Sequence, residues 1–372
     1  MHPLALHEVH AALGARFIED RGFEVVGDYG DPVEEHRALR QTSGVIDLSF
    51  RGRLCLTGAD RVRLLNGQVT NDLKALGELA GCQAAFCGPK GRLVAEAHIY
   101  RLKEELLVEF EPGLTTALID RLEHHIVAED VQVVDVSPYY GLLSVQGPRS
   151  ARVIDRLGAF DTLPSVEDHF VAYSDPALGD LYAMRRSRTG DTGFDLFIPT
   201  DAVSMVFDKL VTAARAENGR AVGFEALELA RFEAGIPRFG IEMNETHLPP
   251  ETGLERTAIS YSKGCYTGQE TIARLRTYGQ VTKALRGLQL MGGTADLPKP
   301  GDTVQWNGKN MGQVMSARHS PTLNQDLAMA YVRKECNAAG TELTVLTASG
   351  SRPAVVVPLP FVAIKPPEVP AA

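Results

Sequence analysis

The stretch KGCYTGQE, from Lys263 to Glu270, sets one cysteine between two glycines and close to a lysine. A buried cysteine usually packs as a small hydrophobe among apolar residues, whereas these neighbours suit an exposed turn. An unperturbed thiol is only about 3 % thiolate at pH 7, and a nearby cation such as Lys263, Arg274 or Arg276 would raise that fraction. Two interpretations follow: Cys265 is a functional thiol, or it is simply the small residue of a glycine turn.

A second group of residues with chemical capability is Asp195 in GFDLF, together with Arg231 and Glu233 in ARFEAG. A carboxylate on a half-buried strand is unfavourable unless hydrogen-bond donors meet it. A heterocycle such as a pterin offers an amino group and a ring N–H side by side, and each charge-assisted bond contributes about 1.5–3 kcal/mol. The alternative is that Asp195 pairs with Arg231 or another arginine for purely structural reasons.

Other polar motifs predict less. The segment Thr70–Asp72 follows a helical pattern and is typical of an Asx turn or a cap. His98, His124 and His125 lack the spacing of metal ligands, so we expect core or solvated histidines and no metal site. The glycine-rich TGDTG does not open a helix, which argues against a phosphate-binding loop.

The elements that must position these residues mix strands and helices. GRLVAEAHIYRLKEELLVEF alternates polar and apolar residues on both sides of KEE, which predicts a β-hairpin. LTTALIDRLEHHIV and AVGFEALELARFEAG carry apolar residues at helical spacing, and Gly235 and Pro237 end the second helix. FDLFIPTDAVSMVFDKLV predicts a strand followed by a helix. An α+β class with antiparallel sheets follows.

The two ends of the chain differ from the middle in their sequence patterns. After Arg286 the sequence becomes a series of short β segments, and Asn307-Gly308 is a strong hairpin-turn signal, so a separate small barrel or sandwich is expected. MHPLALHEVHAALGARFIEDRGFE is typical of an ordinary amphipathic helix and not of a signal peptide. We therefore expect a main region over 1–280, a barrel over 281–365 and a disordered tail over 366–372.

Composition limits the classes of function. The chain has 372 residues, 23 % charged and 44 % hydrophobic, which is typical of a soluble protein of two or three domains. A formal net charge of -9 argues against nucleic acid or a membrane surface as the primary partner. No apolar run approaches the roughly 20 residues that span a bilayer. The five cysteines show neither paired nor metal-ligand spacing, so a reducing cytoplasm is expected.

The order of motifs resembles that of the YgfZ/GcvT-like folate-binding family, relatives of the glycine cleavage T protein (aminomethyltransferase). The resemblance covers roughly residues 36 to 364 and is carried by GVIDLS, LLNGQVTND, LLSVQGP, SRTGDTGFDLF and LELARFEAGIPRFG. KGCYTGQE looks like the signature that separates YgfZ-type proteins from true T proteins.

This resemblance implies a fold, a cofactor and a site. The fold would be a three-subdomain cloverleaf around a central folate channel, with a C-terminal β-barrel. Tetrahydrofolate would be the cofactor, and iron–sulfur client or assembly proteins would be the partners. The residues implied are Cys265 and Lys263 for the chemistry, and Asp195, Arg231, Glu233, Asn71 and Gln269 for folate binding.

Two departures from the T proteins affect the expected activity. T proteins carry paired aspartates on a strand that here reads GRLVAEAHIY, and one of them acts on the folate amine; this chain has Ala95 and Glu96 there. The folate loop is also shorter and lacks its tyrosine. The sequence therefore favours a tetrahydrofolate-binding accessory protein of iron–sulfur cluster assembly or repair, with Cys265 as its functional thiol, over an aminomethyltransferase of the T-protein kind. The alternatives are a tetrahydrofolate-dependent aminomethyltransferase or demethylase-type C1 transferase, and a folate-free scaffold.

Overall fold

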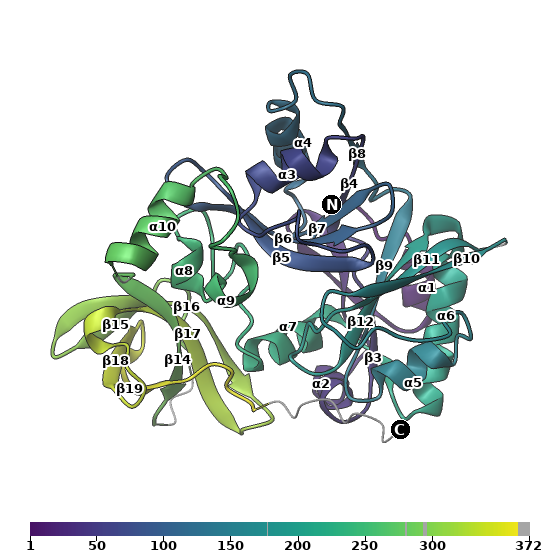
Figure 1. Cartoon of the computed structure of the whole chain (residues 1–372). Coiled ribbons are helices and arrows are strands. Elements are labelled where there is room, and N and C mark those ends of the chain that lie inside the picture. The colour runs from purple at the N-terminus through teal and green to yellow at the C-terminus, as the bar shows by residue number, and fades with distance from the viewer. Residues whose placement is uncertain (177, 280, 293–295, 364–372) are drawn as a thin grey trace.

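The structure is a computed structural model that describes residues 1–176, 178–279, 281–292 and 296–363. Two large β-sheets, a two-stranded hairpin, a set of helices and a closed barrel make up the described structure, and helix α7 (Phe224–Glu233) lies between the barrel and the larger sheet (Figure 1). The expected α+β class with a C-terminal barrel is confirmed. The expected tail, residues 366–372, lies outside the described residues.

The five-stranded sheet is antiparallel, with strand order β5-β6-β7-β4-β8. Its strands are β4 (Gly52–Thr57), β5 (Ala80–Cys87), β6 (Leu93–Arg101), β7 (Leu106–Phe110) and β8 (Gln132–Asp135). β6 and β7 form the hairpin that the alternating sequence predicts. Helices α3 (Arg61–Gln68) and α4 (Thr115–Glu123) cover one face, where Leu65, Leu118 and Leu122 are fully buried in an apolar core.

The six-stranded sheet has the order β10-β11-β12-β9-β3-β13, and only the β3–β13 pair is parallel. Its strands are β3 (Gly44–Asp47), β9 (Tyr140–Gln146), β10 (Phe170–Asp175), β11 (Gly179–Arg185), β12 (Gly193–Pro199) and β13 (Arg220–Ala221). α5 (Ser150–Asp155) and α6 (Thr200–Ala216) pack on one face. The other face shares a core with Tyr100 and Leu107 of the five-stranded sheet and with α7.

The C-terminal barrel closes in the order β14-β17-β16-β15-β18-β19. Its strands are β14 (Lys283–Leu290), β15 (Thr303–Trp306), β16 (Lys309–Ser320), β17 (Gln325–Arg333), β18 (Glu342–Thr347) and β19 (Gly350–Val357), with a 3-10 turn η1 (Lys334–Cys336). Asn307 and Gly308 make the predicted turn between β15 and β16, both with positive φ (49° and 74°). Positive φ at both central residues matches the right-handed twist of the two strands.

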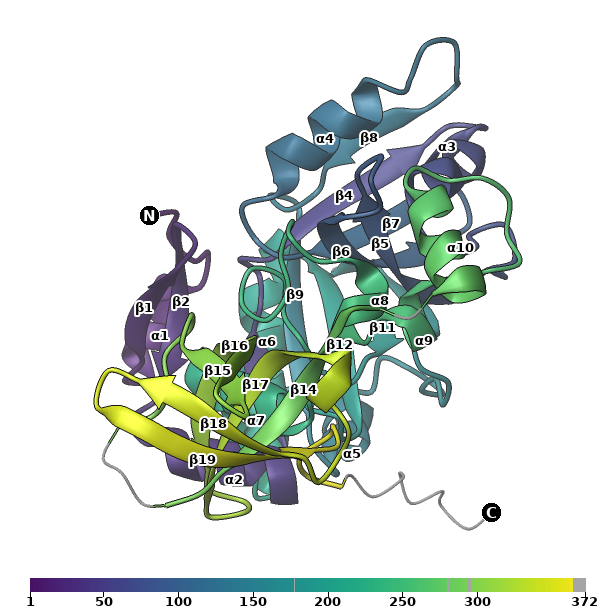
Figure 2. The same ribbon diagram turned by 90° about the vertical axis from the view of Figure 1, so that its left-hand side faces the viewer.

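The N-terminal segment corrects one expectation. Helix α1 spans only His7–Ala12, and the residues after it form a hairpin of β1 (Arg16–Asp20) and β2 (Phe23–Asp28), labelled at the left of Figure 2. The turn falls at Arg21 and Gly22, whose φ angles are 53° and 85°. A continuous helix was therefore wrong for this stretch, because residues with positive φ end a right-handed helix.

Three short helices lead from α7 to the barrel: α8 (Pro249–Thr252), α9 (Glu255–Ala258) and α10 (Gln269–Tyr278). The segment that contains them packs on the β5–β6 end of the five-stranded sheet through residues such as Met243, Leu254 and Ile272. α2 (Pro32–Gln41) completes the set and packs against α7. Within the described residues, no helix has the length and apolar character to cross a bilayer.

One buried carboxylate joins the barrel to the rest of the molecule. Glu233, at the end of α7, is fully buried. One oxygen contacts His36 Nε2 (2.8 Å) and accepts from Arg40 Nη2 (2.8 Å), both on α2. The other oxygen accepts from Ser320 Oγ of β16 at 2.5 Å. Burial acts to raise the pKa of Glu233, but His36, Ser320 and Arg40 outweigh it and lower the pKa to about 2.

We expect Glu233→Ala to lower the free energy of unfolding by about 3–5 kcal/mol, because it leaves the buried His36 and the half-buried Arg40 cation without their carboxylate partner. The pKa of Glu233 is lower in the folded state than the unfolded value of about 4.3. Its contribution is therefore present above pH 4.3 and is lost as the pH falls towards 2. Urea unfolding at pH 7 and pH 3 measures both effects. Glu245→Ala, at an exposed glutamate, is the control. An equally small loss of unfolding free energy in both variants would contradict the role of Glu233 in joining the barrel to the rest of the molecule.

Candidate functional site

A cavity open to solvent lies where the two sheets meet α7. Its walls combine apolar side chains with charged ones. The lining residues are Leu48, Arg51, Gln83, Glu96, Glu111, Arg186, Arg188, Phe224, Leu227, Glu228, Arg231, Ile236, Pro237 and Arg238.

The polar side chains of the five-stranded sheet share one face because strand residues alternate between faces. On β6, Ala95, Ala97 and Ile99 enter the apolar core under α3 and α4, so Glu96 and His98 lie on the opposite face. Cross-strand pairing extends this polar face across β5, β7 and β4. The row is Gln83, His98, Glu109 and Arg53.

The charges of this face are buried and paired. Arg51 makes ion pairs with Glu109 and Glu111. Arg188, from the connection between β11 and β12, lies 3.2 Å from Glu109 Oε1 and 2.7 Å from Asp195 Oδ2. Burial acts to raise the pKa values of Glu109 and Glu111, but the arginines outweigh it, so the first lies well below its usual range and the second is lowered to about 2.

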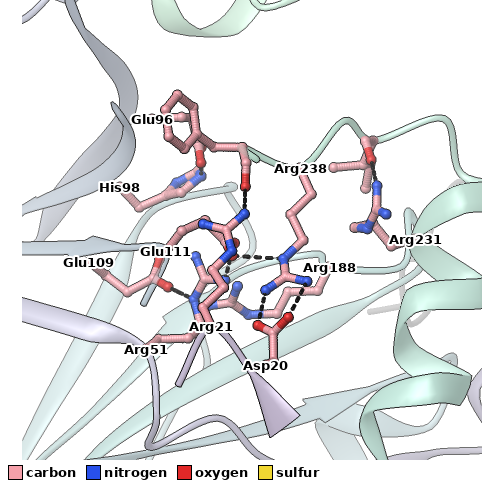
Figure 3. Close-up of polar contacts among 12 residues, drawn as sticks. Asp20, Arg21, Arg51, Glu96, His98, Glu109, Glu111, Arg188, Arg231 and Arg238 are labelled. Carbon is pink, nitrogen blue, oxygen red and sulfur yellow. Dashed lines mark hydrogen bonds and ion pairs between the residues drawn. The ribbon is translucent and has the colours of Figure 1, made fainter. Parts of the chain in front are cut away.

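The α7 side of the cavity carries a second set of pairs. Arg231 donates to Glu228 (2.9 Å) and to Glu242 (3.0 Å). Arg238 donates to Glu111 at 2.7 Å and also pairs with Asp20 of β1. Figure 3 shows Arg238 between Asp20 and Glu111, with Arg51 on the other side of the two glutamates Glu109 and Glu111. The pairs therefore tie α7, the N-terminal hairpin and the five-stranded sheet around one space.

Glu96 differs from the other carboxylates of the cavity. Its Oε1 accepts from Gln83 Nε2 at 2.8 Å and lies 3.1 Å from His98 Nε2 (Figure 3). Its Oε2 has no hydrogen-bond partner among the residues that the structure describes. Burial acts to raise the pKa of Glu96, but His98, Arg186 and Gln83 outweigh it and lower that pKa. Glu96 is thus an ionised carboxylate with one oxygen left for a ligand.

Of the expected folate-binding residues, Arg231 lines the cavity and the others lie elsewhere among the described residues. Asp195 is 1 % exposed; it accepts from Ser144 Oγ at 2.7 Å and pairs with Arg188, which stands between it and the cavity. The structural pairing considered for Asp195 is therefore present, with Arg188 as the partner. Glu233 faces α2 and the barrel, as described above.

Asn71 and Gln269 also have contacts of their own. Asn71 Nδ2 donates to the carbonyl oxygens of Gln83 (2.8 Å) and Thr257 (3.1 Å). Gln269 is the first residue of α10, and its amide reaches the Gly264 carbonyl oxygen at 3.4 Å. Neither side chain is part of the cavity wall.

Within this turn, the Lys263 side chain is buried and the Cys265 side chain faces solvent. Lys263 is buried and donates to the carbonyl oxygens of Asn66, Val69 and Asn71 at 2.6–2.7 Å, while burial lowers its pKa to about 8. Cys265 is exposed.

The other two cations expected near the Cys265 thiol also have partners of their own. Arg274 lies 3.7 Å from Glu270, and the Arg276 guanidinium lies 3.9 Å from the centre of the Tyr261 ring. The turn is therefore open, but its cations are directed at other groups.

Several residues of the cavity were missed at the level of sequence. Glu96 was singled out from the sequence, but Glu111 and the neighbouring His98 and Glu109 were not placed with it, although these residues recur at every second position of AEAH and VEFE and that alternation could have placed them on one face. Arg238 lies in an irregular segment after the end of α7. No periodic pattern in that segment could have indicated which way its side chain points. No group of three or more metal-binding side chains is present within the described ranges.

Comparisons with known proteins agree with this architecture. Residues 6–263 match the family described as the GCVT N-terminal domain, and residues 283–363 match the glycine cleavage T-protein C-terminal barrel domain. The chain is 30 % identical over 363 residues to an aminomethyltransferase of Symbiobacterium thermophilum, covering 96 % of both chains. It is 31 % identical over 357 residues to that of Rubrobacter xylanophilus, covering 96 % of this chain and 93 % of the relative.

Among solved structures, the aminomethyltransferase T of the glycine cleavage system from Bartonella henselae superposes with a TM-score of 0.86. The two chains are 22 % identical, and the match covers 97 % of this chain and 98 % of the other. At this identity the likeness establishes the fold alone.

We expect iodoacetamide to modify Cys265 at least tenfold faster than any other cysteine. Cys55, Cys87 and Cys336 are buried and Cys82 is half-buried, and burial raises the pKa of each of these four thiols. Because the thiolate is the reacting form, burial slows those four thiols through both access and ionisation. Peptide mass spectrometry over a time course measures the rates. Equal rates at Cys265 and Cys82 would show that the turn is closed.

Proposed function

The chain belongs to the glycine cleavage T-protein (GCVT) family, and on that basis we propose that it is a tetrahydrofolate-dependent C1 transferase of the aminomethyltransferase type. The cofactor expected from the sequence, tetrahydrofolate, is the one that this family uses. The alternative stated for the sequence thus takes precedence over the iron–sulfur accessory role. The curated relatives reported above are named aminomethyltransferase, which supports this order.

The residues of the cavity fit a folate ring. Phe224, Leu227 and Ile236 offer apolar surface for a planar heterocycle. Glu228 is a carboxylate in the same wall, and carboxylates accept from adjacent amino and ring N–H donors. We therefore assign Glu228, rather than Asp195, as the acceptor for the pterin donors.

The observation that carries the proposal is the free Oε2 of Glu96. Bound tetrahydrofolate supplies the amine nitrogen that takes up the one-carbon unit. Glu96 accepts the proton of that amine at Oε2, while Gln83 holds Oε1 at 2.8 Å. General acid–base catalysis by a positioned carboxylate contributes about 10²- to 10⁴-fold in rate.

The structure also removes a reason for doubting such an activity. The alanine at position 95 had suggested that one of two necessary carboxylates was lost. Ala95 is fully buried in the apolar core under α3 and α4, on the face of β6 opposite to Glu96. Because neighbouring strand residues point to opposite faces, only one member of this pair can reach the cavity. Ala95 therefore removes nothing from the site.

The remaining cavity residues hold the walls in place. Arg231 orients the Glu228 carboxylate through a contact of 2.9 Å. An ion pair with Asp195 holds Arg188 in place. Arg188 lies in the connection between β11 and β12 and forms part of the cavity wall. These ion pairs position helix α7 and the β11–β12 connection whether or not a ligand is bound.

A role in iron–sulfur cluster assembly remains the second candidate. The features that favour it are the exposed Cys265 and the KGCYTGQE signature around it, which is the part of the resemblance specific to YgfZ-type proteins. Against it, Lys263 and Arg276 are directed away to other partners. In this reading Cys265 would serve client proteins without contacting the folate cavity.

We expect Glu96→Gln to lower tetrahydrofolate-dependent transfer by about 10²- to 10⁴-fold, because the amide cannot accept the proton of the amine. Tetrahydrofolate affinity should change little, since the side chain keeps its shape. Single-turnover transfer from an aminomethyl donor and calorimetric titration of tetrahydrofolate measure the two quantities. Glu104→Gln, at an exposed glutamate of the β6–β7 turn, is the matched control. Full activity of Glu96→Gln would exclude Glu96 as the base.

A further inference from the structure

His98 lies directly behind Glu96 with respect to the cavity. It is two residues further along β6, so both side chains are on the same face of the strand. His98 Nε2 is 3.1 Å from Glu96 Oε1, and His98 Nδ1 is 2.9 Å from Asp168 Oδ1. The imidazole is 1 % exposed. It therefore stands between two carboxylates with each ring nitrogen facing one of them.

We propose that His98, held by Asp168, is a positioning residue that binds Glu96 as an imidazolium and keeps the Oε2 of Glu96 ionised and turned to the ligand. The inference rests on the proposed function only for the role of Glu96 in transfer. The arrangement of the three side chains stands independently of that role.

The chemistry of imidazole explains why the cation is favoured here. A neutral ring donates through one nitrogen and would leave the other nitrogen's lone pair facing a carboxylate oxygen. The imidazolium carries an N–H on both nitrogens: Nδ1 hydrogen-bonds to Asp168, and Nε2 lies within ion-pair distance of Glu96 without the alignment of a hydrogen bond. Burial and Arg186 act to lower the pKa of His98, but Asp168 and Glu96 outweigh them and raise it to about 8.

Asp168 is anchored firmly enough to serve as a support. It precedes β10 of the six-stranded sheet, and its φ of 59° is uncommon for a residue with a side chain. Its backbone N–H donates to the Arg185 carbonyl oxygen at 2.8 Å, and the Phe170 N–H donates to the Leu79 carbonyl oxygen at 3.0 Å. The triad thus bridges the two sheets, with Glu96 and His98 on one and Asp168 on the other.

The remaining polar groups around His98 come from three elements. Gln83 of β5 and Glu109 of β7 are its cross-strand neighbours, and Arg186 reaches it from the end of β11. The charges facing the ring are therefore the carboxylates Glu96, Asp168 and Glu109 and the guanidinium of Arg186. Three negative groups against one positive group support a protonated ring.

The pH dependence follows from the direction of the two shifts. The pKa of His98 is raised, so the cation is present below pH 8 and is lost as the pH rises through that value. The pKa of Glu96 is lowered, so its charge is kept well below neutral pH. Transfer should then fall on the alkaline side near pH 8 and on the acid side only below the usual range of a glutamate.

His98→Gln tests this arrangement because glutamine is neutral at every pH. Removing a cation within 4 Å of a carboxylate raises the carboxylate's pKa by about 1–3 units, so the acid limb should move upward by that amount. The alkaline limb near pH 8 should disappear. Transfer at pH 7 should fall about tenfold to a hundredfold through misplacement of Glu96. His124→Gln, at an exposed histidine, is the matched control.

A second measurement does not depend on turnover. Isotope-labelled histidine allows the His98 ring to be titrated by NMR in the wild type and in Asp168→Asn, which removes the charge and keeps the shape. The inference expects titration near pH 8 in the wild type and a downward shift of at least one unit in the variant.

The outcomes separate the two proposals. Titration of His98 at or below pH 6.5, or an unchanged pH profile in folded His98→Gln, would overturn the positioning role. If His98→Gln does not fold, the titration in Asp168→Asn still decides. If the wild type binds tetrahydrofolate without any transfer but His98 titrates near pH 8, the proposed function fails and the triad stands.

Discussion

Charged side chains that leave water must meet opposite charges, and the region between the two sheets depends on this constraint. The inner face of the five-stranded sheet carries Arg51, Glu109 and Glu111, all buried. Their partners come from two neighbouring segments: Arg188 lies in the β11–β12 connection, and Arg238 lies in the segment after α7. Arg238 also reaches back to the N-terminal hairpin. The same pairs that compensate the buried charges therefore fix the walls of the cavity.

Function arises where this pairing is left incomplete. Arg231 and Arg188 each pair with two carboxylates and Arg238 pairs with three, so these arginines mainly hold the structure of the site together. Glu96 has one oxygen satisfied and one free. A lone ionised carboxylate would be unfavourable at this depth, which is why the two groups behind its bound oxygen matter: Gln83 donates a hydrogen bond and His98 supplies a positive charge. The site is a shell of paired charges in which Glu96 lines the cavity with one oxygen free.

The sequence predicted the local secondary structure better than it predicted which way individual side chains face. The β6–β7 hairpin, the helix ending at Gly235 and the Asn307-Gly308 turn were readable because strand alternation, helical spacing and turn residues are local signals. The ends of α7 show the limit. Arg231 and Glu233 are two residues apart, about 200° around a helix, so one faces the cavity and the other faces the barrel. Which of them faces a ligand depends on what packs against each side. For the same reason His98 passed as an ordinary core histidine until Asp168 was placed beside it.

The most direct test of the account is a crystal structure of the protein with tetrahydrofolate bound. The account predicts the pterin against Phe224 and Leu227, its paired donors on Glu228, and its reacting amine about 2.6–3.2 Å from Glu96 Oε2. A pterin bound at Asp195, or folate bound outside the cavity near Cys265, would contradict it.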